Sequence, residues 1–346
     1  MSALRAAAPG ILTTLQDFGR HGRQRLGIPA GGALDPLSLR AANLLAGNPP
    51  DAGALEIVAQ GPTLVVQASS VRLGLAGARA PIAIIRAAHE RRIEAAVGMS
   101  VTLKRGDVIR IGRVVGASVL YLAVEGGFAV EPTMDSQSTY LRGGFGGFAG
   151  RALQAGDLLP LARNEASPRA ELCLDLAPFA LRTSLRAIEG PQSDFFADEE
   201  RAAFFGRTYR ISPQWSRMGL RLDGEPVRHA RGADIASDGV VQGSIQVPGD
   251  GQPIVLSAER QTTGGYPKIA AVISADLPAL GRLGPGASVR FERVTLDEAE
   301  AAARIHAAFV ERLPTLLAPL PPADVGDLPA RLAAANLVSG VIDARG

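Results

Sequence analysis

Short apolar runs, separated by glycine, proline and polar turns, dominate the chain up to about residue 295. Many of them alternate between apolar and polar residues or are rich in β-branched residues, as strands that line a core are. We predict strands over 55–59, 64–67, 71–75, 82–86, 108–111, 119–124, 172–176, 185–189, 220–222, 244–247, 254–257, 269–273 and 289–294. Such short, closely spaced strands are typical of β-sandwiches and barrels, so we predict a mainly β fold.

Helical spacing is scarce, and its clearest case begins at Asp35. Asp35 suits the N-cap position and Pro36 the first helical position. The apolar residues that follow share one helical face: Leu37, Ala41, Leu44 and Leu45. Gly47 then predicts the end of the helix. We predict further helices over 195–205, 296–310 and 327–337.

The length of 346 residues allows two ordinary domains and a tail. A polar stretch at 163–169 is the best candidate for the connection between the two domains. We therefore expect a first β subdomain with one early helix over 1–165, a second β subdomain over 166–295, and a helical tail over 296–346.

One polar segment interrupts two predicted core strands. Residues 258–271 read Ala-Glu-Arg-Gln-Thr-Thr-Gly-Gly-Tyr-Pro-Lys-Ile-Ala-Ala, although a hairpin between 254–257 and 269–273 needs only a short turn. Two adjacent glycines let the backbone approach a ligand closely. Gln261, Thr262 and Thr263 supply neutral donors and acceptors, which suit an uncharged amide or ureido group. This segment is therefore the leading candidate for a binding site.

A second segment, 135–151, carries hydroxyl groups, Arg142 and a run of glycines. It is either a flexible loop between strands or a binding loop. Backbone N–H groups of successive glycines can bind an anion or a developing oxyanion. Arg142 could hold a carboxylate or phosphate through two hydrogen bonds. We take Ser138, Arg142, Gly143 and Gly144 as candidate binding residues.

Three further groups have two interpretations each. Asp17 and Arg20 either contribute to a site or form an internal ion pair at a turn. Arg217 and Arg221 either bind a ligand or lie on a solvated strand face. Glu56, within an apolar run, is either a buried acid or an outward-facing strand residue.

Composition narrows the class of protein. The chain is 47% hydrophobic and 20% charged, and no apolar run approaches the roughly 20 residues that cross a bilayer. Its start shows no secretory signal, so we expect a cytoplasmic protein without membrane contact. The single cysteine, Cys173, excludes an internal disulfide, and its strand-like flanks favour a buried structural thiol.

Several other functions are disfavoured by the sequence. Lys104 and Lys268 are the only lysines, and the arginines are scattered without interleaved aromatic residues, which argues against nucleic-acid binding. The histidines stand far apart without carboxylates at ligand spacing, so we expect no metal site. Neither lysine has the glycine context of a phosphate-binding P-loop.

Taken in order, several of these motifs resemble one protein family. They are Leu-Thr-Thr-Leu-Gln-Asp-Phe-Gly-Arg at 12–20, Gly-Ala-Leu-Asp-Pro at 32–36, Asn-Leu-Leu-Ala-Gly-Asn at 43–48, Ala-Leu-Glu at 54–56, Ser-Thr at 138–139, Gly-Gly-Phe-Gly-Gly at 143–147, Gly-Arg at 150–151, Ser-Arg-Met-Gly at 216–219 and Gln-Thr-Thr-Gly-Gly-Tyr-Pro-Lys-Ile-Ala at 261–270. The chain resembles the biotin-dependent carboxyltransferase or allophanate-hydrolase-subunit-2 family, which includes the C-subunit of bacterial 5-oxoprolinase. The resemblance covers residues 9–295 and the closing segment 336–343.

The resemblance implies two cyclophilin-like β-barrel subdomains, followed here by the helical tail. It also implies a subunit of an enzyme complex. In one branch of the family, the complex converts 5-oxoproline to glutamate with ATP hydrolysis. In another, a related domain transfers a carboxyl group from carboxybiotin to urea, and the biotin here would arrive on a partner. A third alternative is a non-catalytic regulator that binds a kinase-inhibitor-type protein.

On the leading alternative, a lactam-opening subunit, the residues acquire expected roles. Gln261, Thr262, Thr263, Gly264 and Gly265 would hold the amide or ureido oxygen, with Thr263 close to the reacting group. Lys268 or Tyr266 would donate a hydrogen bond or a proton. Arg142 and Arg217, with the loop residues Ser138, Gly143 and Gly144, would bind the substrate carboxylate or a phosphate.

Overall fold

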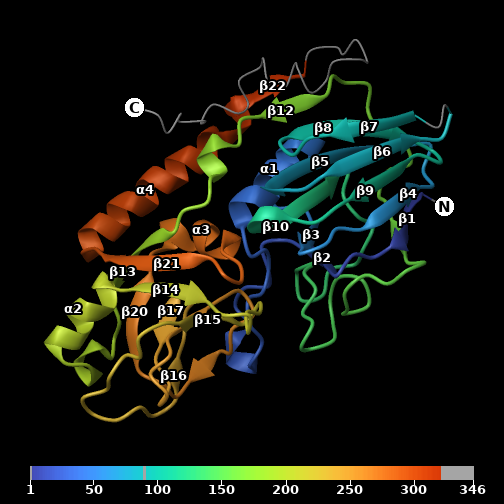
Figure 1. The fold of residues 1–346 in the computed structure, drawn as a ribbon. Coiled ribbons are helices and arrows are strands. Elements are labelled where there is room, and N and C mark those ends of the chain that lie inside the picture. The colour runs from blue at the N-terminus through green and yellow to red at the C-terminus, as the bar shows by residue number, and fades with distance from the viewer. Residues whose placement is uncertain (1, 89–90, 321–346) are drawn as a thin grey trace, which may run out of the picture.

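The computed structural model describes residues 2–88 and 91–320. Two β units lie side by side, and a long helix, α4 (Leu296–Arg312), runs along their outside (Figure 1). A strand occupies each position where the sequence predicts one, so the mainly β prediction is confirmed. Within the described residues, no helix has the length and apolar character needed to cross a membrane.

The first unit consists of two sheets around one core. The six-stranded sheet has the order β11 (Leu158–Pro160), β1 (Ala3–Ala8), β4 (Thr63–Val66), β9 (Val108–Ile111), β6 (Ile82–Arg86), β7 (Arg91–Ala95). The seven-stranded sheet has the order β2 (Leu12–Gln16), β3 (Ala54–Val58), β10 (Val115–Val124), β5 (Ser70–Arg79), β8 (Met99–Lys104), β12 (Leu172–Leu174), β22 (Leu317–Pro319). Alternate residues such as Leu64 and Ile109 of one sheet and Leu73 and Leu122 of the other meet between them.

Helix α1 (Pro36–Ala46) confirms the first helical prediction. The carboxylate of Asp35 accepts hydrogen bonds from the N–H groups of Leu37 and Ser38, and Gly47 adopts a left-handed conformation with φ of 84° at the other end. The helix packs on β5 and β10. Gly74 of β5 allows this, since a Cβ there would lie 2.1 Å from the carbonyl oxygen of Ala42.

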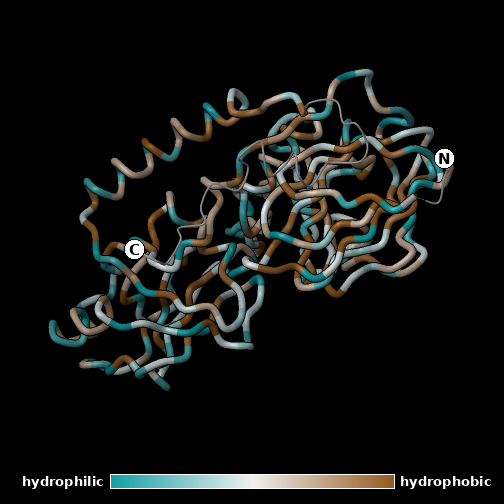
Figure 2. The backbone as a smooth tube through the Cα atoms, turned by 45° about the horizontal axis from the view of Figure 1, so that its top comes forward, coloured by the Kyte–Doolittle hydropathy of each residue, from teal (hydrophilic) through white to brown (hydrophobic). Residues whose placement is uncertain are grey.

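The second unit is a closed barrel. Its strands have the order β13 (Ser184–Glu189), β20 (Lys268–Val272), β17 (Ser244–Gln246), β18 (Ile254–Leu256), β15 (Gly219–Asp223), β14 (Thr208–Ile211), β21 (Ser288–Arg293). Helix α2 (Asp198–Gly206), predicted over 195–205, brings Phe204 into the barrel core, where it stacks on Phe291 at 5.3 Å. Hydrophobic segments run through the interior of both units, whereas α4 alternates in hydropathy along its length (Figure 2).

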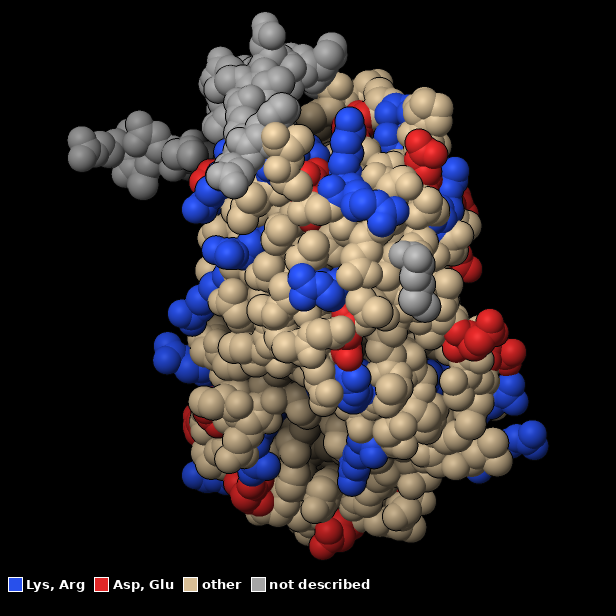
Figure 3. Space-filling model, turned by 90° about the vertical axis from the view of Figure 1, so that its right-hand side faces the viewer, with Lys and Arg blue, Asp and Glu red and all other residues tan. Residues whose placement is uncertain are grey.

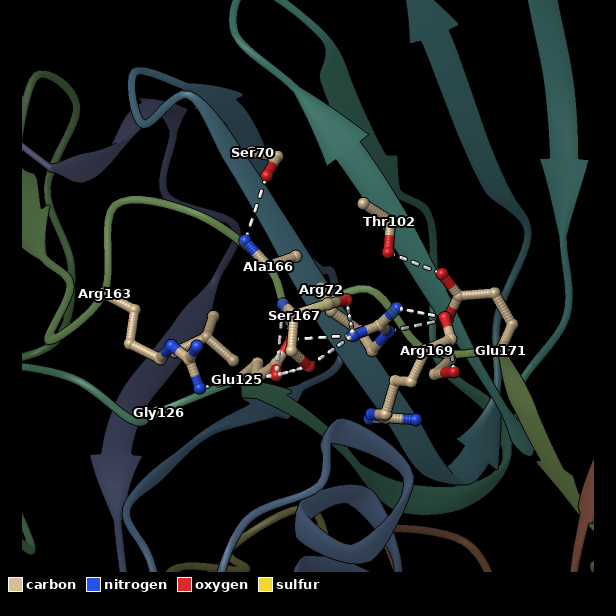
Figure 4. Close-up of polar contacts among 12 residues, drawn as sticks. Ser70, Arg72, Thr102, Glu125, Gly126, Arg163, Ala166, Ser167, Arg169 and Glu171 are labelled. Carbon is tan, nitrogen blue, oxygen red and sulfur yellow. Dashed lines mark hydrogen bonds and ion pairs between the residues drawn. The ribbon is translucent and has the colours of Figure 1, made fainter.

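The polar connection between the units is fixed to the first one by Arg72 (Figure 4). This arginine is buried in β5 and donates to Glu125 at 2.8 Å, to Glu171 at 3.1 Å and to the carbonyl of Arg169 at 2.7 Å. Ser167 also donates to Glu125. After this connection β12 joins the seven-stranded sheet, and β22, which follows α4, pairs with it.

The tail starts as the sequence predicts. Thr295 and Glu298 form a capping box at the start of α4, which agrees with the helix predicted over 296–310. The helix predicted over 327–337 lies outside the described residues. A short helix that the sequence did not predict, α3 (Leu277–Arg282), packs Gly281 against the carbonyl of Leu34, where a Cβ would lie 1.8 Å from the oxygen. This contact brings the barrel directly against the start of α1.

Candidate functional site

Within the polar segment 258–271, residues 261–266 form one side of a short two-stranded arm at the end of the barrel, and Lys268 begins the barrel strand β20. In this arm, β19 (Thr263–Gly264) pairs antiparallel with β16 (Asp238–Gly239). Beside this pair, the N–H of Val240 donates to the carbonyl of Thr262 at 3.2 Å. Thr262 is partly buried and Thr263 is exposed, so both remain accessible to a ligand. The arm therefore presents the predicted neutral groups on an ordered backbone.

Gln246, a buried residue of β17, supports the arm from inside the barrel. Its Oε1 accepts a hydrogen bond from Nε2 of Gln261 at 3.0 Å, and its Nε2 lies 3.5 Å from the carbonyl of Tyr266. Gly264 makes this close approach possible, since a Cβ there would lie 2.4 Å from Nε2 of Gln246. Gln246 was not singled out from the sequence, because its partner Gln261 is 15 residues away in the chain.

Lys268, the first residue of β20, reaches β16 of the arm with its side chain. Its side chain is 3% exposed, and its Nζ lies 3.2 Å from the carboxylate of Asp238, which is 55% exposed. The hydrogen bond from Lys268 and the N–H of Gly239 lower the pKa of Asp238. Tyr266, by contrast, is 41% exposed. The two candidate proton donors of the segment thus occupy different environments, and Asp238 is a polar partner that the sequence did not reveal.

The glycine loop 135–151 is organised by Asp17, at the end of β2. The carboxylate of Asp17 accepts hydrogen bonds from Oγ of Ser136 at 2.7 Å, from N of Gln137 at 2.6 Å and from Oγ of Ser138. Ser138 is completely buried by these contacts. It therefore lies beneath the loop as a supporting residue and does not reach the surface.

Arg20 is buried below the same loop and forms no ion pair with Asp17, so that alternative interpretation is wrong. One of its Nη atoms donates to the carbonyl of Ser138, and its guanidinium lies 5.0 Å from the centre of the Phe145 ring. Its Nε and Nη1 are sealed from solvent without a hydrogen-bond partner in the described part of the chain. Burial lowers the pKa of Arg20, opposed by the charges of Asp17 and Glu259.

The crest of the glycine loop is exposed and reaches the second unit. Arg142, Gly143 and Gly144 are all exposed there. Gly143 packs so closely on Tyr140 that a Cβ would lie 2.4 Å from the ring. Nη1 of Arg142 lies 3.0 Å from Sδ of Met218, in the turn that precedes β15. The loop of one unit and a turn of the other thus meet.

Arg217, next to Met218, is buried between two carboxylates, so the alternative of a solvated strand face is wrong. It donates from Nε to Glu259 at 2.5 Å, from Nη1 to Glu56 and from Nη2 to the carbonyl of Gly32 at 2.6 Å. Burial alone would lower its pKa, but Glu56 and Glu259 hold the pKa of Arg217 well above its ordinary value.

Glu56 itself is a buried acid on β3. It accepts hydrogen bonds from the hydroxyl of Tyr121 at 2.5 Å and from the N–H of Leu34 at 2.8 Å. Burial and the charge of Glu56 raise the pKa of Tyr121 well above its ordinary value. Glu56 and Arg217 therefore join the two units through a buried, fully partnered network.

These contacts bring part of the predicted set into one region. The carbonyls of Arg217 and Met218 accept the N–H groups of Glu259 at 2.8 Å and Ser257 at 2.9 Å, so the turn beneath Arg142 leads directly into the arm. Arg142, with Gly143 and Gly144 beside it, contacts this turn at Met218. Ser138 and Arg217 lie inside the region, where they support the surface residues.

On the face drawn in Figure 3, basic side chains are spread among acidic and uncharged ones, and a hollow opens in its lower half. A cavity of about 450 Å³ lies elsewhere, between the β5–β6 and β7–β8 turns. Over residues 2–88 and 91–320, no three His, Cys, Asp or Glu side chains are grouped so that they could hold a metal ion.

Comparisons with known proteins agree with this architecture. The family model described as "Carboxyltransferase domain, subdomain A and B" matches residues 26–293. The 5-oxoprolinase C-subunit of Escherichia coli is 35% identical over 313 residues, which are 90% of this chain and 97% of that protein. The urea amidolyase of Saccharomyces cerevisiae is 29% identical over 84% of this chain but only 16% of its own length.

A solved structure gives the same result. The urea carboxylase of Kluyveromyces lactis superimposes with a TM-score of 0.81 at 26% identity, over 90% of this chain and 29% of the larger protein. The family model thus matches most of the chain, and a bacterial relative matches it over nearly its full length. The chain belongs to the family of carboxyltransferase domains with subdomains A and B.

Proposed function

We propose that this chain is the lactam-binding subunit of an ATP-dependent 5-oxoprolinase-type complex, which opens 5-oxoproline to glutamate. The observation that carries the proposal is the end-to-end similarity to the Escherichia coli 5-oxoprolinase C-subunit, since 97% of that protein is matched. The urea amidolyase matches over only 16% of its length, so most of that protein has no counterpart in this chain.

The arm supplies chemistry that suits a lactam. A lactam carbonyl is a weak electrophile, and its oxygen needs hydrogen-bond donors as negative charge develops on it. The hydroxyls of Thr262 and Thr263, beside Gly264 and Gly265, offer such donors on a backbone fixed by β16. Gln261, oriented by Gln246, can bind the ring amide.

Lys268 and Tyr266 are the candidates for proton transfer. The ammonium of Lys268 lies 3.2 Å from Asp238 beside the arm, and in this proposal it donates a hydrogen bond or a proton to the bound amide. Tyr266 is exposed and can donate a hydrogen bond to a substrate that approaches the arm from solvent. ATP, bound by the complex, supplies the free energy for opening a stable amide.

Arg142, Gly143 and Gly144 are exposed on the glycine loop beside the turn at Met218, where an anionic group of a substrate or nucleotide could lie. Ser138 and Arg217 act as positioning residues in this proposal, because both are buried and already hydrogen-bonded. Arg217 keeps the turn under Arg142 attached to the arm through Glu259.

The second candidate is carboxyl transfer from a biotin carried on a partner to urea or a similar amide. It is favoured by the superposition on the Kluyveromyces lactis urea carboxylase. Co-expression with the products of neighbouring genes, followed by ATP-turnover assays with 5-oxoproline and with urea, separates the two. Turnover with urea and a biotinylated partner, without turnover of 5-oxoproline, would contradict the leading proposal.

A further inference from the structure

Arg260 directly precedes the arm and was not a candidate in the sequence. Only 9% of its surface is exposed. Its Nε lies 3.4 Å from the carbonyl of Val240, whose N–H in turn donates to the carbonyl of Thr262 at 3.2 Å. The guanidinium is therefore fixed beside the backbone that carries the two threonines.

The charge of Arg260 has no counterion among the described residues. No carboxylate of residues 2–88 or 91–320 forms an ion pair with it, and its two Nη atoms make no hydrogen bond there. Burial is the one influence that shifts its pKa, which it lowers. A buried, uncompensated guanidinium is unfavourable, so such residues are usually paired.

Two other buried arginines of this region provide a comparison. Arg217 is neutralised by Glu56 and Glu259. Arg20 has unpartnered nitrogens, but they are sealed from solvent. The Nη atoms of Arg260 are not among these sealed nitrogens of the described residues, so they keep some contact with solvent. Arg260 is thus a cation that is held in place at Nε, while its Nη atoms have no partner among the described residues.

We propose that Arg260 binds the carboxylate of the substrate, so that the site takes small lactam or amide acids in preference to neutral amides. The Nη1–Nη2 edge of a guanidinium matches the two oxygens of a carboxylate, which gives charge-assisted hydrogen bonds. With the carboxylate there, the amide of the same molecule lies toward Thr262 and Thr263. The inference rests on the proposed function and specifies its substrate class.

A neutral substrate such as urea cannot supply the missing charge. It would leave Arg260 without a counterion in the occupied site. The carboxylate of an acid such as 5-oxoproline neutralises Arg260 on binding. An analogue without the carboxylate lacks this contribution to the binding free energy.

The test uses the co-expressed complex and two substrates that differ in one group, 5-oxoproline and 2-pyrrolidinone. We expect Arg260→Gln to lower kcat/KM for 5-oxoproline roughly 10- to 100-fold, mainly through KM, as for loss of a charged hydrogen bond. Turnover of 2-pyrrolidinone stays at the wild-type level. Arg260→Lys, which keeps the charge but not the planar edge, gives an intermediate loss. Arg290→Gln, at an exposed position of β21, is the matched control and changes neither rate.

Equal losses for both substrates would mean that Arg260 only supports the fold, and a raised KM for ATP would mean that it binds phosphate. Either result overturns the inference while leaving the proposed function intact. If the wild-type complex turns over no 5-oxoproline, the proposed function itself fails. Saturation-transfer NMR on the full chain then still tests Arg260. Equal binding of 5-oxoproline and 2-pyrrolidinone would contradict the inference, and preferential binding of the acid that Arg260→Gln abolishes would support it.

Discussion

Arg282 donates from Nε to Oδ2 of Asp35 at 2.6 Å, and this buried ion pair joins the barrel unit to helix α1 of the other unit. Asp35 is fully buried and also caps the helix, so one carboxylate serves the fold of one unit and its attachment to the next. A second buried ion pair between the two units, formed by Arg217 and Glu56, lies beside the candidate site. The relative position of the glycine loop and the arm thus depends on buried charges.

Arg282→Met should lower the free energy of unfolding by about 3 kcal/mol, because it leaves the buried carboxylate of Asp35 without its counterion. Urea denaturation measures this loss. The double variant Asp35→Asn/Arg282→Met should recover part of it, since no uncompensated charge remains. A loss below about 1 kcal/mol in the single variant would show that the ion pair is not important for stability.

The network around Arg72 predicts a pH dependence. Burial would raise the pKa of Glu125, but the hydrogen bonds from Ser167 and the charge of Arg72 lower it below its ordinary value of 4.5. The ionised form is therefore preferred in the folded state, so its stabilisation is present above pH 4.5 and is lost as the pH falls.

Glu125→Gln should consequently cost about 2 kcal/mol of unfolding free energy at pH 7. The difference between variant and wild type should shrink as denaturation curves are measured at successively lower pH, down to about 3.5. A constant difference over this range would contradict the proposed role of the ionised carboxylate.

Gly264→Ala tests whether the close contact between the arm and Gln246 matters for activity. A Cβ at this position would lie 2.4 Å from Nε2 of Gln246 and would displace the side chain that orients Gln261. We expect roughly a 10-fold or greater loss of turnover by the complex, as displaced donors no longer meet the substrate oxygen. Gly249→Ala is the control, since a Cβ there meets only Ala233 at 3.6 Å. Equal activities of the two variants would show that the contact between Gly264 and Gln246 does not matter for catalysis.

Cys173 should react slowly with thiol reagents in the folded protein. It is buried in β12, as its strand-like flanks predict, and burial raises the pKa of its thiol. Ellman's reagent at pH 8 should therefore modify it rapidly only after denaturant is added. Rapid, stoichiometric modification of the native chain would show that β12 opens readily or that the thiol is accessible.

The sequence predicts local features of this fold well. Asp35, Pro36 and Gly47 define α1 because capping depends on neighbouring residues. Strands with apolar alternation are predictable too, because the alternation is also a pattern of neighbouring residues. Strands such as β1 and β7 were missed, since alanine in one and arginine in the other mask the pattern.

Partners distant in the chain could not be predicted in this way. Arg217 and Glu56 are 161 residues apart, so nothing in the local sequence showed that this arginine is enclosed. The pairing of Lys268 with Asp238 depends on β16, which is only two residues long and has no strand signal. Arg260 was missed although it lies within the polar segment 258–271, because its lack of a counterion becomes visible only in three dimensions.

The most direct test of the central claim is turnover by the complex assembled from this chain and the products of its neighbouring genes. We predict ATP-dependent formation of glutamate from 5-oxoproline, no turnover of urea, and a loss of at least roughly 10-fold in both Thr263→Ala and Lys268→Ala. Full activity of both variants would refute the assignment of the arm. Carboxylation of urea without glutamate formation from 5-oxoproline would contradict the account as a whole.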